Sequence, residues 1–469
     1  MSGNLIKFSQ HKSKSEYPEL IWPGKRPFTS MEFHPAHCCE VHGNSANGWM
    51  NRIYLGDNLH VMGNLLSEFR GKINLIYIDP PFNSMSDYTK KITVQDRENN
   101  AINEIKEKQY SDIWKNGEYL QFMYERLILI RELLAETGSI YVHCDWHQGH
   151  HIRLLMDEVF GPENFRNEIA WCYLVNKGRF MNKYPPRHDT ILFYAKTAAN
   201  YFNRESIRME PSAETLKRWR PYANKNGEVP YGKLTPGMKR VAGKGEKPYI
   251  LRGGIQVDWI TSIPGINSGH SKENSGYPTQ KPERLIETFI KASSKPGDLV
   301  FDCFMGSGTT QAVAMKLGRR FIGADINPCA VQTTATRLLK TAKTIHSKPS
   351  NDPIYSGFEI YNTAKVQANQ AEADITINKN LLIINNYSPK PLLNKLDIKS
   401  AEKIEWRSLV ESIMIDFNYD GCVIRPTEID IPGKKELVKG IYKIPECTKI
   451  LLMKITGLLS ESLEMEIRL

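Results

Sequence analysis

Several common features are missing from this chain of 469 residues. No apolar run approaches the length that spans a membrane, and the polar N-terminus carries no apolar signal core. The eight cysteines are scattered without the spacing of a disulfide scaffold, and there is neither an internal repeat nor a low-complexity segment. These absences predict a cytoplasmic protein with reduced thiols and without a membrane partner.

An extreme charge of one sign is missing as well. Lysine and arginine together number 62 against 52 for aspartate and glutamate, which gives a net charge of +10. A mild basic excess is compatible with a polyanionic partner but does not prove one. The length alone suggests about three domains.

The clearest local signal is a quartet, Asp79, Pro80, Pro81 and Phe82, directly after the apolar run 75–78. The run predicts a buried strand that the two prolines end. The Asp79 carboxylate accepts hydrogen bonds, the rigidly held Pro80 carbonyl is a second acceptor, and Phe82 offers a ring for stacking. Two acceptors and a ring suit an exocyclic amine on a nucleobase. For the quartet taken alone, an ordinary turn at the end of a strand is the alternative.

The second signal is a strand, a glycine turn and a helix, in the order that doubly wound α/β folds use to hold nucleotides. The strand is residues 299–301, the turn contains Gly306 and Gly308, and the helix covers 311–317. The turn lacks the Gly-Lys-Ser/Thr of a phosphate-binding loop, which favours a cofactor that approaches a bare glycine backbone. Asp325 ends the next strand, about twenty residues on, where an acidic residue binds ribose hydroxyls in such folds.

Together these two signals resemble the S-adenosylmethionine-dependent amino methyltransferases of DNA. The catalytic quartet precedes the glycine turn, as in the circularly permuted β class, and the resemblance covers about residues 50–340. The nearest look-alikes are modification subunits of type III restriction systems and their shorter relatives. Cys303 stands where the family usually has proline, and Phe82 where tyrosine is commoner. Further segments match in order at 56–58, 138–145 and 278–286.

The resemblance implies a Rossmann-like α/β fold with a circularly permuted, mostly parallel seven-stranded sheet. It implies methyl transfer from S-adenosylmethionine to the N6 amine of adenine in double-stranded DNA, in a restriction-modification system or an orphan relative. Adenine is favoured over cytosine N4 because cytosine-N4 members usually carry serine at the position of Asp79. A cytosine-C5 enzyme is excluded because no cysteine nucleophile follows the catalytic strand. A catalytically silent nucleic-acid-binding partner or an RNA enzyme is the alternative from another class.

The same resemblance assigns roles to individual residues. Asp79, Pro80, Pro81 and Phe82 are implied to be catalytic, with no metal. The implied contacts to S-adenosylmethionine come from Asp57, Lys281, Asp302, Phe304, Gly306, Ser307, Gly308, Thr309 and Asp325. The expected location is the cytoplasm of a prokaryotic type of cell, with association to the nucleoid when DNA is bound. A homodimer and a restriction subunit stay open as protein partners.

Two clusters of histidine and cysteine invite a metal hypothesis that their spacing does not favour. His34, His37, Cys38, Cys39 and His42 match no paired zinc pattern. The second cluster follows a predicted strand, where the family places base or cofactor contacts without metal. Its members are His143, Cys144, His147, His150 and His151.

DNA contacts are expected in two basic stretches. The loop between the strand-like runs 169–175 and 190–194 mixes basic and aromatic residues, which suits contacts to phosphates and bases. Residues 200–275 break the α/β rhythm where the family carries its target-recognition region. The residues predicted to bind DNA are Lys177, Arg179, Arg187, Lys217, Arg218 and Arg220.

The remaining expectations concern the organisation of the chain. Residues 1–50 are predicted to be an N-terminal arm and 51–345 the catalytic domain, whereas 355–469 form a small β-rich α+β domain with a helix near 406–415. The role of this C-terminal domain stays open between DNA clamping, dimer contact and docking of a restriction partner. The polar loop 83–117, which carries Tyr88, Tyr110 and Trp114, is expected to cover the site.

Overall fold

The described part of the chain in this computed structural model comprises residues 5–7, 18–95, 101–114, 117–173, 184, 186–209, 211, 213–219, 228–229, 249–250, 254–266, 273–347, 355–363, 371–395, 404–433 and 436–469.

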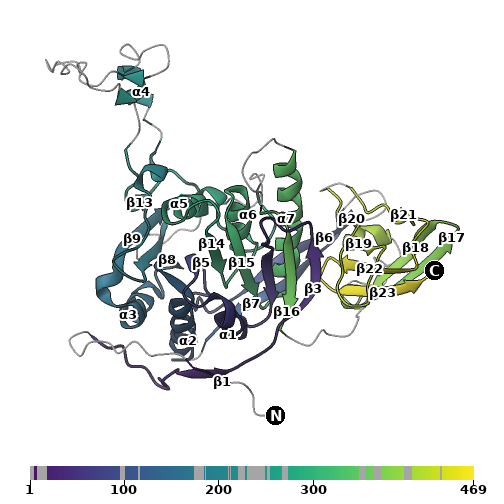
Figure 1. The fold of residues 1–469 in the computed structure, drawn as a ribbon, viewed down its shortest axis with the longest axis horizontal. Helices are drawn as coiled ribbons and strands as arrows, with labels where there is room; N and C mark the ends of the chain where they lie inside the picture. The colour runs from purple at the N-terminus through teal and green to yellow at the C-terminus, as the bar shows by residue number, and fades with distance from the viewer. Residues whose placement is uncertain are drawn as a thin grey trace.

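A twisted central sheet organises the larger part of the molecule (Figure 1). Six neighbouring strands, from β8 to β16, run parallel, whereas β10 is antiparallel to both of its neighbours and β3 is antiparallel to β16. The strand order across the sheet is β13 (Trp259–Ile260), β9 (Phe165–Cys172), β10 (His188–Ala195), β8 (Leu134–Cys144), β5 (Ile73–Ile78), β14 (Leu299–Asp302), β15 (Arg320–Asp325), β4 (Asn51–Leu55), β16 (Phe358–Asn362) and β3 (His37–His42).

The predicted α/β class with a mostly parallel sheet is confirmed, but the sheet is wider than expected. Within the described residues it holds ten strands, not seven. The seven strands from β9 to β4 stand in the middle, and β13, β16 and β3 extend the two edges. A parallel sheet is covered on both faces, which explains why β5 is an almost continuous buried apolar run.

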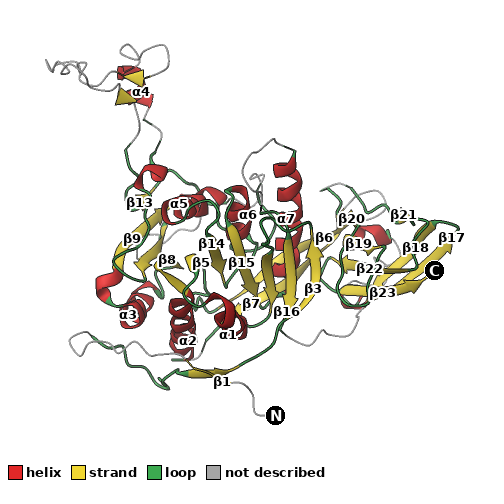
Figure 2. Ribbon diagram, in the orientation of Figure 1, coloured by secondary structure: helices red, strands yellow, loops and turns green. Residues whose placement is uncertain are grey.

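Helices cover both faces of the sheet (Figure 2). One apolar cluster joins the sheet to α1 (Asn58–Phe69), α2 (Glu118–Leu133) and α3 (Gly149–Phe160). A second cluster joins the opposite face to α5 (Glu283–Ser293), α6 (Thr309–Lys316) and α7 (Pro328–His346). The helix expected over 311–317 is present as α6.

The segment after the catalytic quartet is not the irregular loop that the sequence suggested. It forms an antiparallel hairpin of β6 (Ser86–Gln95) and β7 (Ala101–Asp112), which extends from the central sheet toward the C-terminal strands (Figure 1). Its polar and charged sequence hid the strands, because a ribbon that is solvated along much of its length needs few apolar residues.

The C-terminal strands form two small sheets. One consists of β17 (Ala371–Asn378), β18 (Leu381–Pro389) and β21 (Ile441–Lys443), and the other has the order β20 (Glu428–Asp430), β19 (Val410–Asp416), β22 (Ile450–Gly457) and β23 (Ser462–Arg468). The helix expected near 406–415 is wrong: Trp406–Leu409 is a 3-10 turn and strand β19 follows. The described helix in this part is the four-residue α8 (Lys390–Leu393).

Two expected boundaries also need correction. Strand β16 belongs to the central sheet, so the segment 355–469 begins inside the catalytic part. Strand β3 forms the edge of the same sheet, and Trp22 lies in the apolar core, so the segment 1–50 is partly built into that core. The sequence concealed both because these two strands are short and partly polar. Near the N-terminus, β1 (Leu5–Lys7) pairs with β2 (Ser30–Glu32).

The region 200–275 is described only in part. Helix α4 (Ala213–Trp219) and the paired strands β11 (Glu228–Val229) and β12 (Tyr249–Ile250) project away from the body of the molecule (Figure 1). Strand β13, by contrast, joins the central sheet beside β9. Short 3-10 turns occupy Pro162–Asn164 and Arg204–Ile207. No helix among the described residues is long and apolar enough to cross a membrane.

Candidate active site

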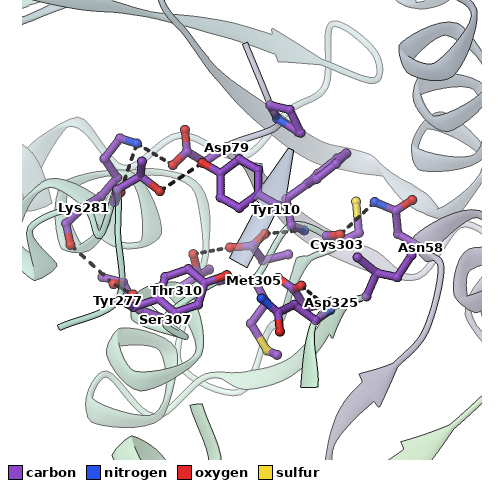
Figure 3. Close-up of a pocket in the computed structure, with 18 of the residues that line it drawn as sticks. Asn58, Asp79, Tyr110, Tyr277, Lys281, Cys303, Met305, Ser307, Thr310 and Asp325 are labelled. Atoms are coloured by element: carbon purple, nitrogen blue, oxygen red, sulfur yellow. Dashed lines mark hydrogen bonds and ion pairs between the residues drawn. The ribbon is translucent and has the colours of Figure 1, made fainter. Parts of the chain in front are cut away.

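Three neighbouring parallel strands bring the predicted catalytic and cofactor residues to one edge of the sheet. Strands β5, β14 and β15 are adjacent, and their carboxyl ends carry Asp79, Asp302 and Asp325. Ligands of open α/β sheets bind at this edge. All three aspartates line a cavity of about 460 Å³. Figure 3 labels Asp79 and Asp325 on its wall.

Asp79 has two carboxylate oxygens with different surroundings. Oδ2 accepts a hydrogen bond from the ammonium group of Lys281, a residue 202 positions later in the sequence. Oδ1 is buried and has no hydrogen-bond partner among the described residues. A buried acceptor without a donor is costly, so Oδ1 is suited to a donor that a ligand supplies.

The loop after Asp79 is held by one buried carboxylate. Asp112 accepts hydrogen bonds from the backbone N–H groups of Phe82, Asn83 and Ser84, at 3.0, 2.7 and 2.8 Å. Its Oδ1 also accepts from the indole nitrogen of Trp114 at 3.2 Å. Asn83 has a positive φ of 54°, which this set of contacts stabilises.

Behind the loop lies a buried polar chain. The His143 ring nitrogens lie 3.0 Å from the Tyr77 hydroxyl and 3.0 Å from the Asp189 carboxylate. The ring also stacks on Phe82, with centroids 6.2 Å apart. His143 therefore supports Phe82 from one side, and both of its nitrogens are used by side chains.

The end of the cavity that holds the predicted cofactor residues is built around two carboxylates with backbone donors. Asp302 accepts from the Phe304 N–H at 3.0 Å and from the Thr310 hydroxyl at 2.6 Å. Asp325 accepts from the Gly306 N–H at 2.8 Å. Burial raises the pKa of the Asp302 carboxyl to about 7 and that of the Asp325 carboxyl to about 6, against the hydrogen bonds, which lower both.

Another part of the cavity wall contains a buried arginine that the sequence analysis missed. The Arg126 guanidinium bonds Asp57 at 2.9 Å and Asn58 at 2.6 Å, and lies 3.5 Å from the Phe122 ring centroid. Asn58 in turn donates to the Cys303 carbonyl at 2.9 Å, which ties this wall to the glycine turn. Burial lowers the pKa of Arg126, and the Asp57 carboxylate opposes that shift.

The signal for Arg126 was present in the sequence. It shares the apolar face of α2 with Met123 and Ile130, at helical spacings of three and four. A charge in an apolar stripe is expected to have a buried partner. Other cavity-lining residues that sequence reasoning passed over are Tyr77, Tyr277, Ile326 and Asn327.

Most of the predicted site residues meet at the cavity, and a few do not. Pro80, Phe82 and Gly308 are not on its wall: Pro80 is buried, and Gly308, at a φ of 69°, precedes α6. Lys281 lines the cavity, but its ammonium group faces Asp79, and its expected cofactor contact stays a prediction. The predicted residues on the wall are Asp57, Asp79, Pro81, Lys281, Asp302, Phe304, Gly306, Ser307, Thr309 and Asp325.

The two predicted DNA-binding residues whose side chains the structure describes, Arg187 and Lys217, do not line this cavity. Arg187 directly precedes β10, and Lys217 is exposed on α4. Lys177, Arg179 and Arg220 lie outside the described residues, as does the side chain of Arg218. In the described part of the chain, no group of three histidine, cysteine or acidic side chains is placed to hold a metal ion.

Comparison with known proteins identifies the family. The model of a DNA methylase family, of the N6 and N4 amino type, matches residues 73–336, which is more than half of the chain. The chain belongs to this DNA methylase family. The matched region contains β5, the hairpin, Lys281 and the glycine turn, so one family pattern spans both ends of the cavity.

Individual members of the family differ in how much of their length this chain covers. The type II methyltransferase M.EcaI of Enterobacter cloacae is 31% identical, over 61% of this chain and 69% of that protein. The DNA adenine methyltransferase YhdJ of Escherichia coli is 27% identical, over 59% and 81%. The probable HindVI Mod subunit of a Haemophilus influenzae type III system is 24% identical, over 62% of this chain and half of its own length.

Proposed function

We propose that this DNA methylase transfers a methyl group from S-adenosylmethionine to the N6 amine of adenine in duplex DNA. The observation that carries the proposal is the buried Asp79 Oδ1, an acceptor at the wall of the cavity that has no donor among the described residues. An amine offers the N–H donor that this oxygen lacks. A relative named as a DNA adenine methyltransferase supports the choice of adenine over cytosine.

The cavity fits S-adenosylmethionine. Its volume of about 460 Å³ lies in the range of small-molecule sites. Gly306 has a φ of 51°, which favours glycine, and its backbone borders the cavity without a side chain. Asp325 and Asp57 would hold hydroxyl and amino groups of the cofactor. When bound, S-adenosylmethionine supplies an electrophilic methyl group.

On the substrate side, the chain positions the amine. The target adenine leaves the duplex, at a cost of a few kcal/mol, and Phe82, backed by His143, stacks on it. Asp79 Oδ1 and the Pro80 carbonyl accept hydrogen bonds from the amine, which directs the nitrogen lone pair away from the ring. Positive charge that develops on this nitrogen is stabilised by the Asp79 carboxylate.

The Lys281 ammonium group has a defined place in this scheme. By occupying Asp79 Oδ2, it leaves Oδ1 as the acceptor that faces the amine. It also lies 5.6 Å from the Phe82 ring centroid, within the range of a cation–π contact. Lys281 thus fixes both groups that would hold the base.

Sequence readout is assigned to the basic stretches outside the cavity. We place DNA contacts on the loop around Arg187 and on the insert that contains Lys217. Because the insert projects from the body, it can reach along a duplex while the cavity receives one base (Figure 1). The same proposal includes association with a second copy of the chain or with a restriction subunit. It also includes a cytoplasmic location at the nucleoid.

The deciding experiment is methyl transfer from labelled S-adenosylmethionine to duplex DNA of mixed sequence, followed by nucleoside analysis. N6-methyl-2′-deoxyadenosine in the product supports the proposal. N4-methyl-2′-deoxycytidine would move the target to the other amine of the family. In a parallel reaction with RNA, label in the RNA and none in the DNA would reject DNA as the substrate. The Asp79→Ala variant provides the background rate.

A further inference from the structure

One element joins the active site to the C-terminal sheets. The β6–β7 hairpin begins at Ser86 and ends at Asp112, beside the catalytic loop, and its distal part is buried among the C-terminal strands. We propose that the C-terminal domain is a positioning element of the active site and acts through this hairpin. The inference rests on the proposed function, because it assigns a role in the same reaction.

At the base of the hairpin, Asp112 is the positioning residue. Only 1% of its surface is exposed, and its two oxygens accept four N–H donors, three of them from successive residues of the catalytic loop. No other described side chain makes this set of bonds. A shift of Asp112 therefore shifts the Phe82 ring and the backbone that follows Pro81.

Next along β7, the hairpin supports the cofactor side. The Asn327 amide donates to the Gln109 carbonyl at 2.9 Å, and the Asn327 backbone N–H donates to Asp325 at 2.9 Å. Tyr110 lines the cavity and stacks on Tyr88 of β6, with ring centroids 4.8 Å apart. One strand thus contacts both ends of the cavity.

The distal part of the hairpin is anchored in the C-terminal core. Val94 is fully buried and Ile105 nearly so, in one apolar cluster with Ile413, Leu451 and Met453. On the neighbouring surface, Glu107 of β7 forms an ion pair with Lys395. Ile105 and Asp112 are seven residues apart on one strand, about 23 Å.

The C-terminal domain is itself fixed to the central sheet, so it can serve as a support. The backbone of Ile424 bonds the edge strand β3, with Val41 N–H to Ile424 O at 2.8 Å and Ile424 N–H to Cys39 O at 3.0 Å. A buried ion pair joins Glu40 of β3 to Lys454 of β22. The hairpin is thereby held at both ends by one connected body.

This arrangement has a mechanical consequence. An isolated two-stranded hairpin is at best marginally stable in water, so β6–β7 needs its anchor to hold Asp112 in place. A misplacement of about 1 Å in a reacting geometry can lower the rate about 100-fold. Loosening the anchor should therefore lower kcat, even when DNA and cofactor are saturating.

The test is Val94→Ser in the full chain. We expect kcat to fall tenfold or more, toward the roughly 100-fold limit of a misplaced site. The amides of Phe82, Asn83 and Ser84 should exchange hydrogen faster, because Asp112 no longer holds them. Lys106→Ala is the matched control: it changes an exposed side chain next to Ile105 and should leave kcat and amide exchange unchanged.

A double variant separates positioning from general damage. If the anchor acts through Asp112, adding Val94→Ser to Asp112→Asn should lower kcat little further, because residues that act as a unit are not additive. Independent, multiplying losses would overturn the proposal. So would a loss confined to KM for DNA with unchanged kcat and exchange, which would make the domain a DNA clamp.

A charge swap keeps the proposal testable if Val94→Ser does not fold. Glu107→Lys places two ammonium groups together and should speed exchange at residues 82–84, whereas Glu107→Lys with Lys395→Glu should restore it. No effect of the single change, or no rescue by the pair, counts against the proposal. Amide exchange can be measured without turnover. If the wild-type protein showed no methylation activity, the proposed function would be rejected, whereas the exchange measurements would still test this inference.

Discussion

Three aspartates lie at the ends of three neighbouring strands, but the groups around their carboxylates differ between the two halves of the cavity. Asp79 faces an ammonium group and keeps one buried oxygen without a partner among the described residues. Asp302 and Asp325 face backbone N–H groups and, for Asp302, a hydroxyl, and burial raises the pKa of both carboxyls. Under the proposed function, the same type of side chain would take part in the reaction in one half and would hold the cofactor in the other.

The difference teaches that position at the edge of the sheet does not assign a role. The neighbouring groups do: a cation binds one oxygen of Asp79, whereas burial raises the pKa of the other two carboxyls. The predictions that follow change one half at a time, and each should leave the other half nearly intact.

The largest effect is expected from Asp79→Ala, which removes the acceptor for the amine and the charge beside it. Removing one such stabilising group typically costs about 100- to 1,000-fold in kcat. Binding of S-adenosylmethionine should change little, because the cofactor half is untouched. Single-turnover methylation and calorimetry test the two statements, and near-wild-type turnover would remove Asp79 from the mechanism.

Asp325→Ala should act on the opposite half. Loss of hydrogen bonds to a charged group costs about 1.5–3 kcal/mol, or roughly ten- to 100-fold in the Kd for S-adenosylmethionine. Affinity for DNA, measured by fluorescence anisotropy without cofactor, should be unchanged. An unaltered cofactor Kd by calorimetry would count against the assigned pocket.

Phe82→Leu tests the stacking surface with a smaller change. Stacking of a base on an aromatic side chain contributes about 1–3 kcal/mol, so the loss in kcat/KM should be about tenfold. Phe82→Tyr is the matched control and should stay close to wild type because it keeps the ring. Fluorescence of 2-aminopurine at the target position reports the flipped base, and equal signals from both variants would contradict the stacking role.

A different effect concerns the stability of the fold. The pKa of Asp302 is about 7 in the folded protein and 3.8 as its ordinary value, so the folded state keeps this proton to a higher pH. The free energy of unfolding should therefore fall as pH rises from about 4 to 7, by at most about 1.4 kcal/mol per pH unit from this group. Asp302→Asn should make the free energy of unfolding, measured by urea titration, fall less with pH. If the free energy fell equally with pH in both proteins, the raised pKa of Asp302 would be contradicted.

Local sequence determined much of the site. The apolar run 75–78 and the two prolines placed Asp79 at the end of a buried strand, because proline cannot continue a ladder. The glycine turn and Asp325 followed from the strand, turn and helix pattern. Such features depend on a few consecutive residues, which is why they could be predicted.

Only the tertiary structure decided which side chains meet. Lys281 reaches Asp79 across 202 positions, Arg126 reaches Asp57 from another helix, and the hairpin places Asp112 under the catalytic loop while burying Val94 in the C-terminal core. No local pattern encodes these pairs, because each depends on how strands are ordered in the sheet and on which distant surface covers them. The sequence determined the chemistry at the strand ends, and the packing of distant segments determined its partners.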